Sequence, residues 1–541
     1  MTLSPTGHVD GFARDNLPPQ ELWPELDLSA LPDYPDRLNC AVTLLDDHVA
    51  AGSGDRPVLY AGDTVWSYAE LQAQANRIAH VLVDELGVVP GSRVLLRAAN
   101  TPMLVAAWFG VVKAGAVAVA TMPLLRAREL RAIADKAHVD FALCDAALKG
   151  ELEAAREAGG WLSKVLYWGP GEGLDAAMAR APADFTAAKT AADDVVLIAF
   201  TSGTTGAPKG CMHFHRDVMA MCDTYARHIL KPVADDVFCG TPPLAFTFGL
   251  GGLTIFPMFV GAATALTAKP GPEPLMEAIQ RHRATVCFTA PTGYRAMAGR
   301  AGDYDLSSLR ACVSAGEALP KPTFELWQET TGVRILDGIG ATEMLHIFIA
   351  AAEADIRPGA TGTPVPGYKA QVIDDDGQPV PAGTVGRLAV KGPTGCRYLA
   401  DPERQARYVH DGWNLTGDAY LCDEDGYFWY QARTDDMIIS SGYNIAGPEV
   451  EAALLDHPLV KDCAVVASPD EERGQIPKAF VVLSDGSQAG DATAKQLQDF
   501  VKAQIAPYKY PRAVAFVDDL PRTETGKVQR FKLRQQEFAA G

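Results

Sequence analysis

The stretch that decides the fold runs from residue 195 to residue 210 and reads VVLIAFTSGTTGAPKG. Its apolar first half predicts a buried strand, and the glycine- and hydroxyl-rich second half predicts a loop that binds a polyphosphate. Glycine lets backbone N–H groups approach anionic oxygens, hydroxyl groups add hydrogen-bond donors, and a lysine adds positive charge. The loop residues expected at the phosphates are Thr201, Ser202, Gly203, Thr204, Thr205, Gly206 and Lys209.

This loop does not fit the nucleotide-binding pattern G-x-x-x-x-G-K-[ST]. Counted from Gly203, that pattern requires glycine at position 208 and Ser or Thr at position 210, where the chain has Pro208 and Gly210. No hydroxyl therefore follows the lysine to bind Mg²⁺. Taken alone, the stretch is also compatible with an ordinary surface loop, so the interpretation depends on the rest of the chain.

Length and charge narrow the class of protein. A chain of 541 residues exceeds the size of a single core, so we expect more than one domain. The formal net charge of −19 argues against a binder of nucleic acid or of anionic membranes. The ten cysteines form no C-x-x-C pair, and Asp10, Arg14 and Asp15 argue against a secretory signal at the N-terminus. We therefore expect a reduced, cytoplasmic setting.

The run from residue 237 to residue 268 contains no charged residue and is long enough to cross a bilayer. It also contains several prolines and glycines and has no basic cluster beside it. This composition favours buried strands and a helix near a ligand over a membrane span.

The order of elements predicts an α/β fold. Helical and strand patterns alternate over residues 41–150, 195–230 and 285–327, which is typical of mostly parallel sheets covered by helices. From about residue 360, short strands separated by Gly and Pro indicate a β-rich subdomain. We therefore expect a large N-terminal domain over residues 1–434, with its β-rich part at about 360–434, and a small α+β C-terminal domain over 435–541.

Further clusters follow the loop in order: Gly340-Ala341-Thr342-Glu343, Thr416-Gly417-Asp418, Arg433-Thr434-Asp435-Asp436, and Pro521 to Lys527. Their order and spacing resemble the adenylate-forming superfamily, which includes acyl-CoA synthetases, peptide-synthetase adenylation domains and luciferases. The resemblance extends from about residue 40 to 535. Each cluster alone is a weak signal, but the series is specific.

The resemblance implies ATP, Mg²⁺ and CoA as ligands and gives each cluster a role. Glu343 binds Mg²⁺, Thr342 donates to the α-phosphate, and Asp418 accepts from the ribose hydroxyls with Arg433 beside it. The residues implied at the adenine ring are Gly316, Glu317, Ala318, Asp337 and Gly338.

Two implied roles concern the C-terminal domain. Lys527 bridges the acyl carboxylate and the α-phosphate, so its charge stabilises the transition state in which pyrophosphate departs. The small domain is then expected to rotate about Asp435, and Gly442 lines a tunnel for the pantetheine arm of CoA.

The acid pocket is expected from the segment after the phosphate loop and from strand ends near residues 290–345, at Phe246, Thr247, Phe248, Tyr294, Gly340 and His346. Phenylalanines beside glycines make a flat apolar slot that suits an aromatic ring. The segments resemble the benzoate and 2-aminobenzoate branch of aryl-CoA ligases, although benzoate ligases typically carry Ala-Tyr at Thr247-Phe248. Thr247 and His346 either contact a substituent on the ring or are buried polar residues that form hydrogen bonds within the protein, and both interpretations remain open.

Two rival functions share the same motifs. A stand-alone adenylation enzyme would load a carrier protein in place of CoA, but the segment from Pro243 to Gly249 offers no acid to bind an amino acid's ammonium group. A nucleotide-binding sensor without catalysis would not be expected to keep Lys209, Glu343, Asp418, Arg433 and Lys527 together. The prediction is an aryl-CoA ligase, and the sequence leaves open whether it forms a homodimer.

Overall fold

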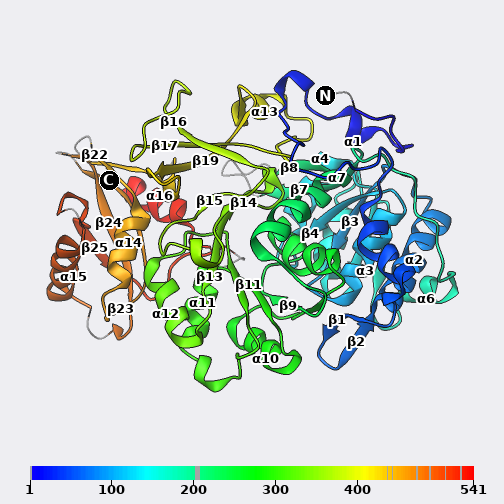
Figure 1. The fold of residues 1–541 in the computed structure, drawn as a ribbon, viewed down its shortest axis with the longest axis horizontal. Helices are drawn as coiled ribbons and strands as arrows, with labels where there is room; N and C mark the ends of the chain where they lie inside the picture. The colour runs from blue at the N-terminus through cyan, green and yellow to red at the C-terminus, as the bar shows by residue number, and fades with distance from the viewer. Residues whose placement is uncertain are drawn as a thin grey trace.

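The computed structural model describes residues 3–201, 208–434, 436–440, 443–470, 473–486, 489–505, 507–523 and 527–540. It confirms the predicted α/β class: the large N-terminal part contains two mostly parallel sheets with helices on their faces and a separate antiparallel sheet (Figure 1). A smaller α+β part formed by the C-terminal residues lies at one end of the molecule. The predicted domain boundary at residues 434 and 435 stays a prediction.

The first sheet has the strand order β6-β5-β3-β4-β7-β8 and is parallel except for the antiparallel pair β7 and β8. Alternate residues of β3 face opposite cores: Val94 and Leu96 pack with α2 and α3, and Leu95 packs with α4 and α5. The strands are β3 (Arg93–Arg97), β4 (Val117–Thr121), β5 (Phe141–Asp145), β6 (Lys164–Trp168), β7 (Val195–Thr201) and β8 (Lys209–Phe214). The helices around it are α1 (Phe12–Asp15), α2 (Tyr68–His80), α3 (Pro102–Lys113), α4 (Ala127–Ala137), α5 (Lys149–Glu157), α6 (Gly173–Arg180) and α7 (His215–Met221).

The second sheet has the order β15-β14-β13-β12-β11-β9-β10-β1-β2, with a parallel centre and antiparallel edges. Its two faces also meet different cores, because Phe288 belongs to the central core and the adjacent Cys287 belongs to the core beneath α10, α11 and α12. The strands are β1 (Pro57–Ala61), β2 (Thr64–Ser67), β9 (Val237–Gly240), β10 (Ala263–Ala265), β11 (Val286–Thr289), β12 (Ala311–Ser314), β13 (Ile335–Gly340), β14 (Ile347–Ala350) and β15 (Thr363–Pro364). The helices are α8 (Thr247–Leu250), α9 (Phe256–Phe259), α10 (Pro272–His282), α11 (Pro291–Ala298) and α12 (Lys321–Thr331).

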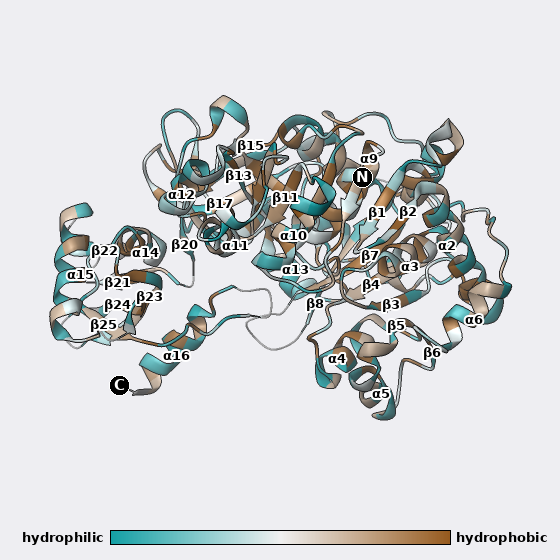
Figure 2. Ribbon diagram, turned by 90° about the horizontal axis from the view of Figure 1, so that it is seen from below, coloured by the Kyte–Doolittle hydropathy of each residue, from teal (hydrophilic) through white to brown (hydrophobic). Residues whose placement is uncertain are grey.

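The β-rich region and the C-terminal part follow in sequence. The antiparallel sheet contains β16 (Lys369–Ile373), β17 (Val385–Lys391), β18 (Val409–His410), β19 (Trp413–Cys422) and β20 (Phe428–Arg433), with α13 (Pro402–Tyr408) beside it. The C-terminal part contains β21 (Ile438–Ser440), β22 (Tyr443–Ile445), α14 (Gly447–Leu455), β23 (Val460–Asp470), β24 (Gly474–Leu483), α15 (Asp491–Gln504), β25 (Ala513–Phe516) and α16 (Arg530–Ala540). Figure 2 shows this part beside the larger one, with the outer helix α15 largely hydrophilic in colour. Only Leu497 and Val501 of α15 are buried, so most of this helix faces away from the core.

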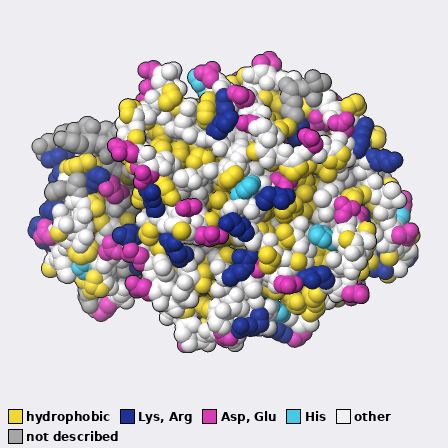
Figure 3. Space-filling model, in the orientation of Figure 1, with side chains coloured by type: hydrophobic (Ala, Val, Ile, Leu, Met, Phe, Trp, Pro, Cys, Tyr) yellow, Lys and Arg dark blue, Asp and Glu magenta, His cyan; other side chains and the backbone are white. Residues whose placement is uncertain are grey.

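The uncharged run at residues 237–268 folds as β9, α8, α9 and β10 with short helical turns between them. Its glycines allow close packing, since a Cβ on Gly252 would lie 2.5 Å from a ring carbon of Phe288. Within the described ranges, no helix combines the length and apolar character needed to cross a membrane. On the face shown in Figure 3, basic and acidic side chains are interspersed, so no single continuous region of that face carries the net negative charge.

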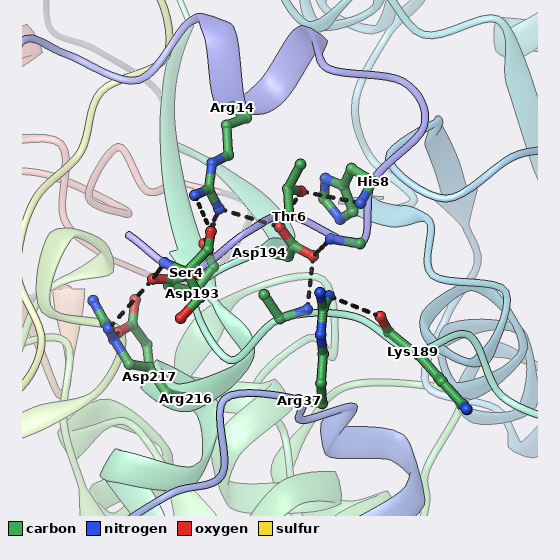
Figure 4. A network of polar contacts seen from close by, with 12 residues as sticks. Ser4, Thr6, His8, Arg14, Arg37, Lys189, Asp193, Asp194, Arg216 and Asp217 are labelled. Atoms are coloured by element: carbon green, nitrogen blue, oxygen red, sulfur yellow. Dashed lines mark hydrogen bonds and ion pairs between the residues drawn. The ribbon is translucent and has the colours of Figure 1, made fainter. Parts of the chain in front are cut away.

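Residues 4–14 are anchored beside the start of β7 (Figure 4). Arg14 forms ion pairs with Asp193 and Asp194, and the backbone N–H of Ser4 donates to Asp193 at 2.8 Å. The backbone N–H of Gly7 donates to Asp194, also at 2.8 Å. These buried contacts fix the strand that leads into the phosphate loop.

Candidate active site

The phosphate loop connects β7 to β8, and the structure places its two ends opposite each other. Thr201 and Lys209 are partners in the antiparallel register, so both lie at the same end of the sheet. Lys209 is half-buried. Ser202, Gly203, Thr204, Thr205 and Gly206 lie outside the described residues, and their predicted role stays a prediction.

Thr342 and Glu343 lie on a 3₁₀ turn, η9 (Thr342–Met344), directly after the end of β13. The next residue, Leu345, has φ +71° and ψ −42°, a strained conformation for a residue with a Cβ. Such a turn persists only when its surroundings fix it.

Three buried side chains from distant parts of the chain fix this turn. His213 on β8 lies with Nε2 2.7 Å from the carbonyl oxygen of Thr342, and because a carbonyl only accepts, Nε2 carries the proton. The hydroxyl of Tyr398 donates to Oε1 of Glu343 at 2.6 Å. The hydroxyl of Thr394 donates to the carbonyl of Met344 at 2.7 Å.

Behind His213 lies a buried ion pair between Asp217 and Arg397, with Nη1 to Oδ2 at 2.8 Å and both side chains fully buried. Burial alone would raise the pKa of Asp217, but the charge of Arg397 and the neighbouring His213 and Arg216 lower it well below its usual range. Arg397 also lies over the ring of Phe214 at 4.0 Å. The pair therefore supports the strand that carries His213.

Asp418 and Arg433 lie opposite each other on β19 and β20. Arg433 Nη1 is 2.9 Å from Oδ1 of Asp418 and donates to the carbonyl of Thr416 at 3.1 Å. Burial raises the pKa of the Asp418 carboxyl, and the Arg433 charge opposes that effect. The two residues predicted at the ribose are thus brought together as a charged pair.

The residues predicted at the adenine ring occupy adjacent strand ends. Gly316, Glu317 and Ala318 follow β12, and Asp337 and Gly338 lie on the neighbouring β13. Gly316 has φ +92°, which favours glycine. Burial raises the pKa of Asp337 to about 7 and raises that of Glu317 as well. Oδ1 of Asp337 and Oε1 of Glu317 are buried without a hydrogen-bond partner among the described residues, as expected for groups that meet a polar ligand.

Lys527 extends from the C-terminal part to this same place. A Cβ on Gly316 would lie 3.2 Å from Cε and 3.4 Å from Nζ of Lys527. Lys527 is solvent-exposed as a residue, but surrounding protein atoms desolvate its ammonium group and lower its pKa, while the charges of Glu317 and Asp418 act in the opposite direction. Asp435 and Gly442, predicted at the hinge and the CoA tunnel, lie outside the described residues.

Most residues predicted at the acid lie around an aromatic cluster formed by Tyr225, Phe248, Phe256, Phe288 and His346. Phe248 has ring-centroid distances of 5.5 Å to Phe288 and 5.7 Å to His346. Gly340 allows β14 to approach, since a Cβ there would lie 2.8 Å from the carbonyl oxygen of His346. Phe246 and Thr247 line a small cavity together with Trp108, Leu197, Leu244 and Leu250.

The structure does not bring Tyr294 to this cluster. Its side chain is fully buried on the opposite face of the second sheet, where its hydroxyl donates to the carbonyls of Cys287 and Val313 at 2.9 Å and 3.0 Å. Its ring packs on Trp327 with centroids 5.0 Å apart. The helical turn after residue 290 points this side chain into the core beneath α11 and α12, so the prediction that Tyr294 contacts the acid is not supported.

The buried histidines predict an acid sensitivity of the fold. Burial lowers the pKa of His215 and of His346 to about 3, from an ordinary value of 6.5. Between these values the unfolded chain binds protons that the folded chain does not, so stability falls as the pH falls. We expect each histidine to cost about 1.4 kcal/mol at pH 5.5 relative to neutral pH.

Urea unfolding at pH 7.5 and pH 5.5 tests this expectation. Other groups titrate over the same interval, so the informative quantity is the difference between wild type and His346→Phe, which removes one of the two titrating rings from an aromatic setting. An identical loss of stability in both proteins would contradict the expectation.

Several residues that support the site were not predicted. His213 had a weak signal in the sequence, because Lys209, Cys211 and His213 alternate along one strand and share a face. Tyr398 and Thr394 had none, since each contacts the turn from a segment that is about 50 residues away in sequence.

Comparison with known proteins shows the family to which this chain belongs. The profile of the AMP-binding enzymes matches residues 46–398, more than half of the chain, and the profile of the AMP-binding enzyme C-terminal domain matches residues 449–527. The chain belongs to the AMP-binding enzyme family. The second match ends at Lys527, the residue whose side chain lies beside Gly316.

Individual relatives of this AMP-binding enzyme cover nearly its full length. It is 38% identical over 516 residues to a benzoate–CoA ligase of Thauera aromatica, covering 92% of this chain and 96% of that protein. The crystal structure of the anthranilate CoA ligase AuaEII in complex with anthranoyl-AMP matches with a TM-score of 0.89 at 35% identity, over 94% of this chain and 99% of that one. A benzoate CoA ligase from Burkholderia xenovorans LB400 matches with a TM-score of 0.85 at 34% identity, over 92% and 100% of the two chains.

Proposed function

We propose that this AMP-binding enzyme is an ATP-dependent aryl-CoA ligase. It converts an aromatic carboxylate, ATP and CoA to the aryl-CoA thioester, AMP and pyrophosphate through an acyl-adenylate. The observation that carries the proposal is the position of Lys527, which reaches from the C-terminal part to Gly316 and interacts with the charges of Glu317 and Asp418. The similarity to benzoate and anthranilate CoA ligases over nearly the whole chain supports it.

In the first half-reaction, an oxygen of the acid's carboxylate attacks the α-phosphorus of ATP, and the bond to the bridging oxygen of the β-phosphate breaks. The acid is already ionised at neutral pH, so the enzyme needs no general base. Lys527 would neutralise the charge that develops between the carboxylate and the α-phosphate, and Thr342 would donate to an α-phosphate oxygen. Lys209 and the phosphate loop would bind the departing pyrophosphate.

Glu343 is the protein's candidate ligand for Mg²⁺, which would neutralise polyphosphate charge. Tyr398 donates to Oε1, and among the described residues no hydrogen bond to Oε2 occurs, so that oxygen fits a single metal–carboxylate contact. The described part of the chain contains no group of three or more His, Cys, Asp or Glu side chains arranged to bind a metal. This arrangement suits Mg²⁺, which commonly binds one or two carboxylates and completes its octahedral shell with phosphate and water oxygens.

In the second half-reaction, the sulfur of CoA attacks the acyl carbon of the adenylate and AMP leaves. Lys527 would have to withdraw to admit the pantetheine arm, with rotation at Asp435 and passage beside Gly442. The aromatic cluster around Phe248 and His346 fits a planar ring, and the Thr247 hydroxyl next to the small cavity favours a substituted ring such as that of 2-aminobenzoate.

The proposal is tested by ATP–pyrophosphate exchange with a panel of benzoates, fatty acids and amino acids, followed by thioester formation with free CoA. We expect exchange with aromatic acids and release of the aryl-CoA. Preference for an amino acid, or exchange without thioester formation on CoA, would contradict the proposal and favour a carrier-loading enzyme.

Replacing Thr247 with alanine tests whether its hydroxyl recognises a substituent on the ring. If its hydroxyl bonds to an ortho substituent, kcat/KM for 2-aminobenzoate relative to benzoate should fall by about 5- to 10-fold, the effect of one modest hydrogen bond. Thr254→Ala is a matched control, since Thr254 is buried nearby and its hydroxyl has no hydrogen-bond partner among the described residues. An unchanged ratio in Thr247→Ala would show that this hydroxyl does not recognise the substituent.

A further inference from the structure

Two neighbouring tyrosines, the buried Tyr398 and the half-buried Tyr408, lie next to Glu343. Tyr398 and Tyr408 pack edge to face with ring centroids 5.7 Å apart. The hydroxyl of Tyr398 donates to Oε1 of Glu343 at 2.6 Å, whereas the hydroxyl of Tyr408 is buried without a hydrogen-bond partner among the described residues. The two rings are in contact with each other, but only the hydroxyl of Tyr398 bonds to Glu343.

The backbone around Tyr398 is itself fixed. Its N–H donates to Oε1 of Gln405 at 2.9 Å, and Gln405 is fully buried on α13. The Nε2 group of Gln405 donates to the carbonyls of Leu22 and Cys396 at 3.0 Å and 2.9 Å. The Tyr398 hydroxyl is therefore a donor in a set position, supported through Gln405 by the N-terminal region and by the segment between β17 and α13.

This contact determines how the Glu343 carboxylate is presented. A free glutamate side chain on a surface turn samples several rotamers, and its two oxygens exchange by rotation of the carboxyl group. A hydroxyl bonded to Oε1 restricts that rotation, and a hydrogen bond to a charged acceptor is among the stronger ones in proteins. Oε2 then has a defined direction from the η9 turn, whose backbone is fixed by His213 and Thr394.

We propose that Tyr398 is a positioning residue for the first half-reaction: its hydroxyl orients Glu343 so that Oε2 binds the magnesium ion of ATP. The inference rests on the proposed function, because it takes Glu343 as the metal ligand. Tyr398 does not touch substrate in this assignment and acts only through Glu343. The same role follows whichever carboxylic acid the enzyme activates.

The experiment compares Tyr398→Phe with Tyr408→Phe. Pyrophosphate release is measured as Mg²⁺ is titrated, and CoA transfer is measured separately from a supplied acyl-adenylate. For Tyr398→Phe we expect the Mg²⁺ concentration at half-maximal rate to rise by roughly 10-fold, the loss expected for a hydrogen bond to a charged group, with CoA transfer within about 2-fold of wild type. Tyr408→Phe should match wild type in both assays.

Three outcomes separate the inference from the function on which it rests. If Tyr398→Phe has the same Mg²⁺ dependence as Tyr408→Phe while Glu343→Gln shifts it, the positioning role is wrong and the metal role of Glu343 stands. If Glu343→Gln leaves the Mg²⁺ dependence unchanged, the metal role in the proposed function is wrong. Equal loss of both half-reactions in Tyr398→Phe would show a general structural defect and would also overturn the positioning role.

Discussion

Replacing Lys527 with alanine should abolish pyrophosphate release while CoA transfer from a supplied acyl-adenylate continues. The ammonium group lies beside Gly316 and within the field of Glu317 and Asp418, where it would neutralise charge on the α-phosphate only during the first half-reaction. Removing one such charge-stabilising group typically costs about 100- to 1,000-fold in rate, so we expect at least the lower figure.

The two half-reactions are measured separately, by ATP–pyrophosphate exchange and by thioester formation from purified adenylate. Lys532→Ala is the control, because Lys532 is exposed on α16 only a few residues away. Equal loss of both half-reactions in Lys527→Ala would contradict a role restricted to adenylate formation, and unchanged exchange would exclude Lys527 from the chemistry.

The second large effect concerns stability. Arg397→Ala would leave the Asp217 carboxylate buried without its main partner, 2.8 Å away in the native protein. Breaking a fully buried pair from one side costs about 3–5 kcal/mol, so we expect a loss of this order in the free energy of unfolding. Arg216 and His213 lie near Asp217 and reduce the penalty toward the lower figure.

Urea or thermal unfolding measures this effect, with Arg357→Ala as the control. Arg357 pairs with Asp425 at 2.8 Å on the surface, and such exposed pairs contribute about 0–1 kcal/mol. The double variant Arg397→Met with Asp217→Leu should recover part of the loss, because it removes both buried charges. A loss in Arg397→Ala no larger than that in Arg357→Ala would show that the buried pair does not contribute as expected.

Local sequence determined much of the architecture. The strand β7, the alternation of helices and strands over residues 41–150 and the β-rich region after about residue 360 agree with their predictions. These elements follow from periodicity and capping, which depend on neighbours in sequence; α2, for example, begins with Ser67 and Glu70 in a reciprocal capping arrangement. The uncharged run at residues 237–268 was likewise interpreted as buried elements because its prolines and glycines are visible in the sequence.

The prediction for Tyr294 shows what local sequence does not decide, namely which core a side chain enters. The segment after β11 is near the aromatic cluster in sequence, but the position of a residue around α11 decides which core its side chain enters. Phe288 and Cys287 are adjacent but belong to cores on opposite faces of the sheet. Tyr294 lies in the same core as Cys287. Only the packing of α11 on α12 settles that choice.

The sequence by itself therefore determined the fold class and predicted the residues to which we assign the proposed chemistry: Lys209, Thr342, Glu343, Asp418, Arg433 and Lys527. Their motifs are short and contiguous, because each must present several groups from one turn or strand end. The tertiary structure alone decided what orients them: His213 on Thr342, Tyr398 on Glu343, and Lys527 against Gly316. Those contacts join residues far apart in sequence through single hydrogen bonds or close approaches, which leave no periodic pattern and arise only when the sheets and the C-terminal part pack together.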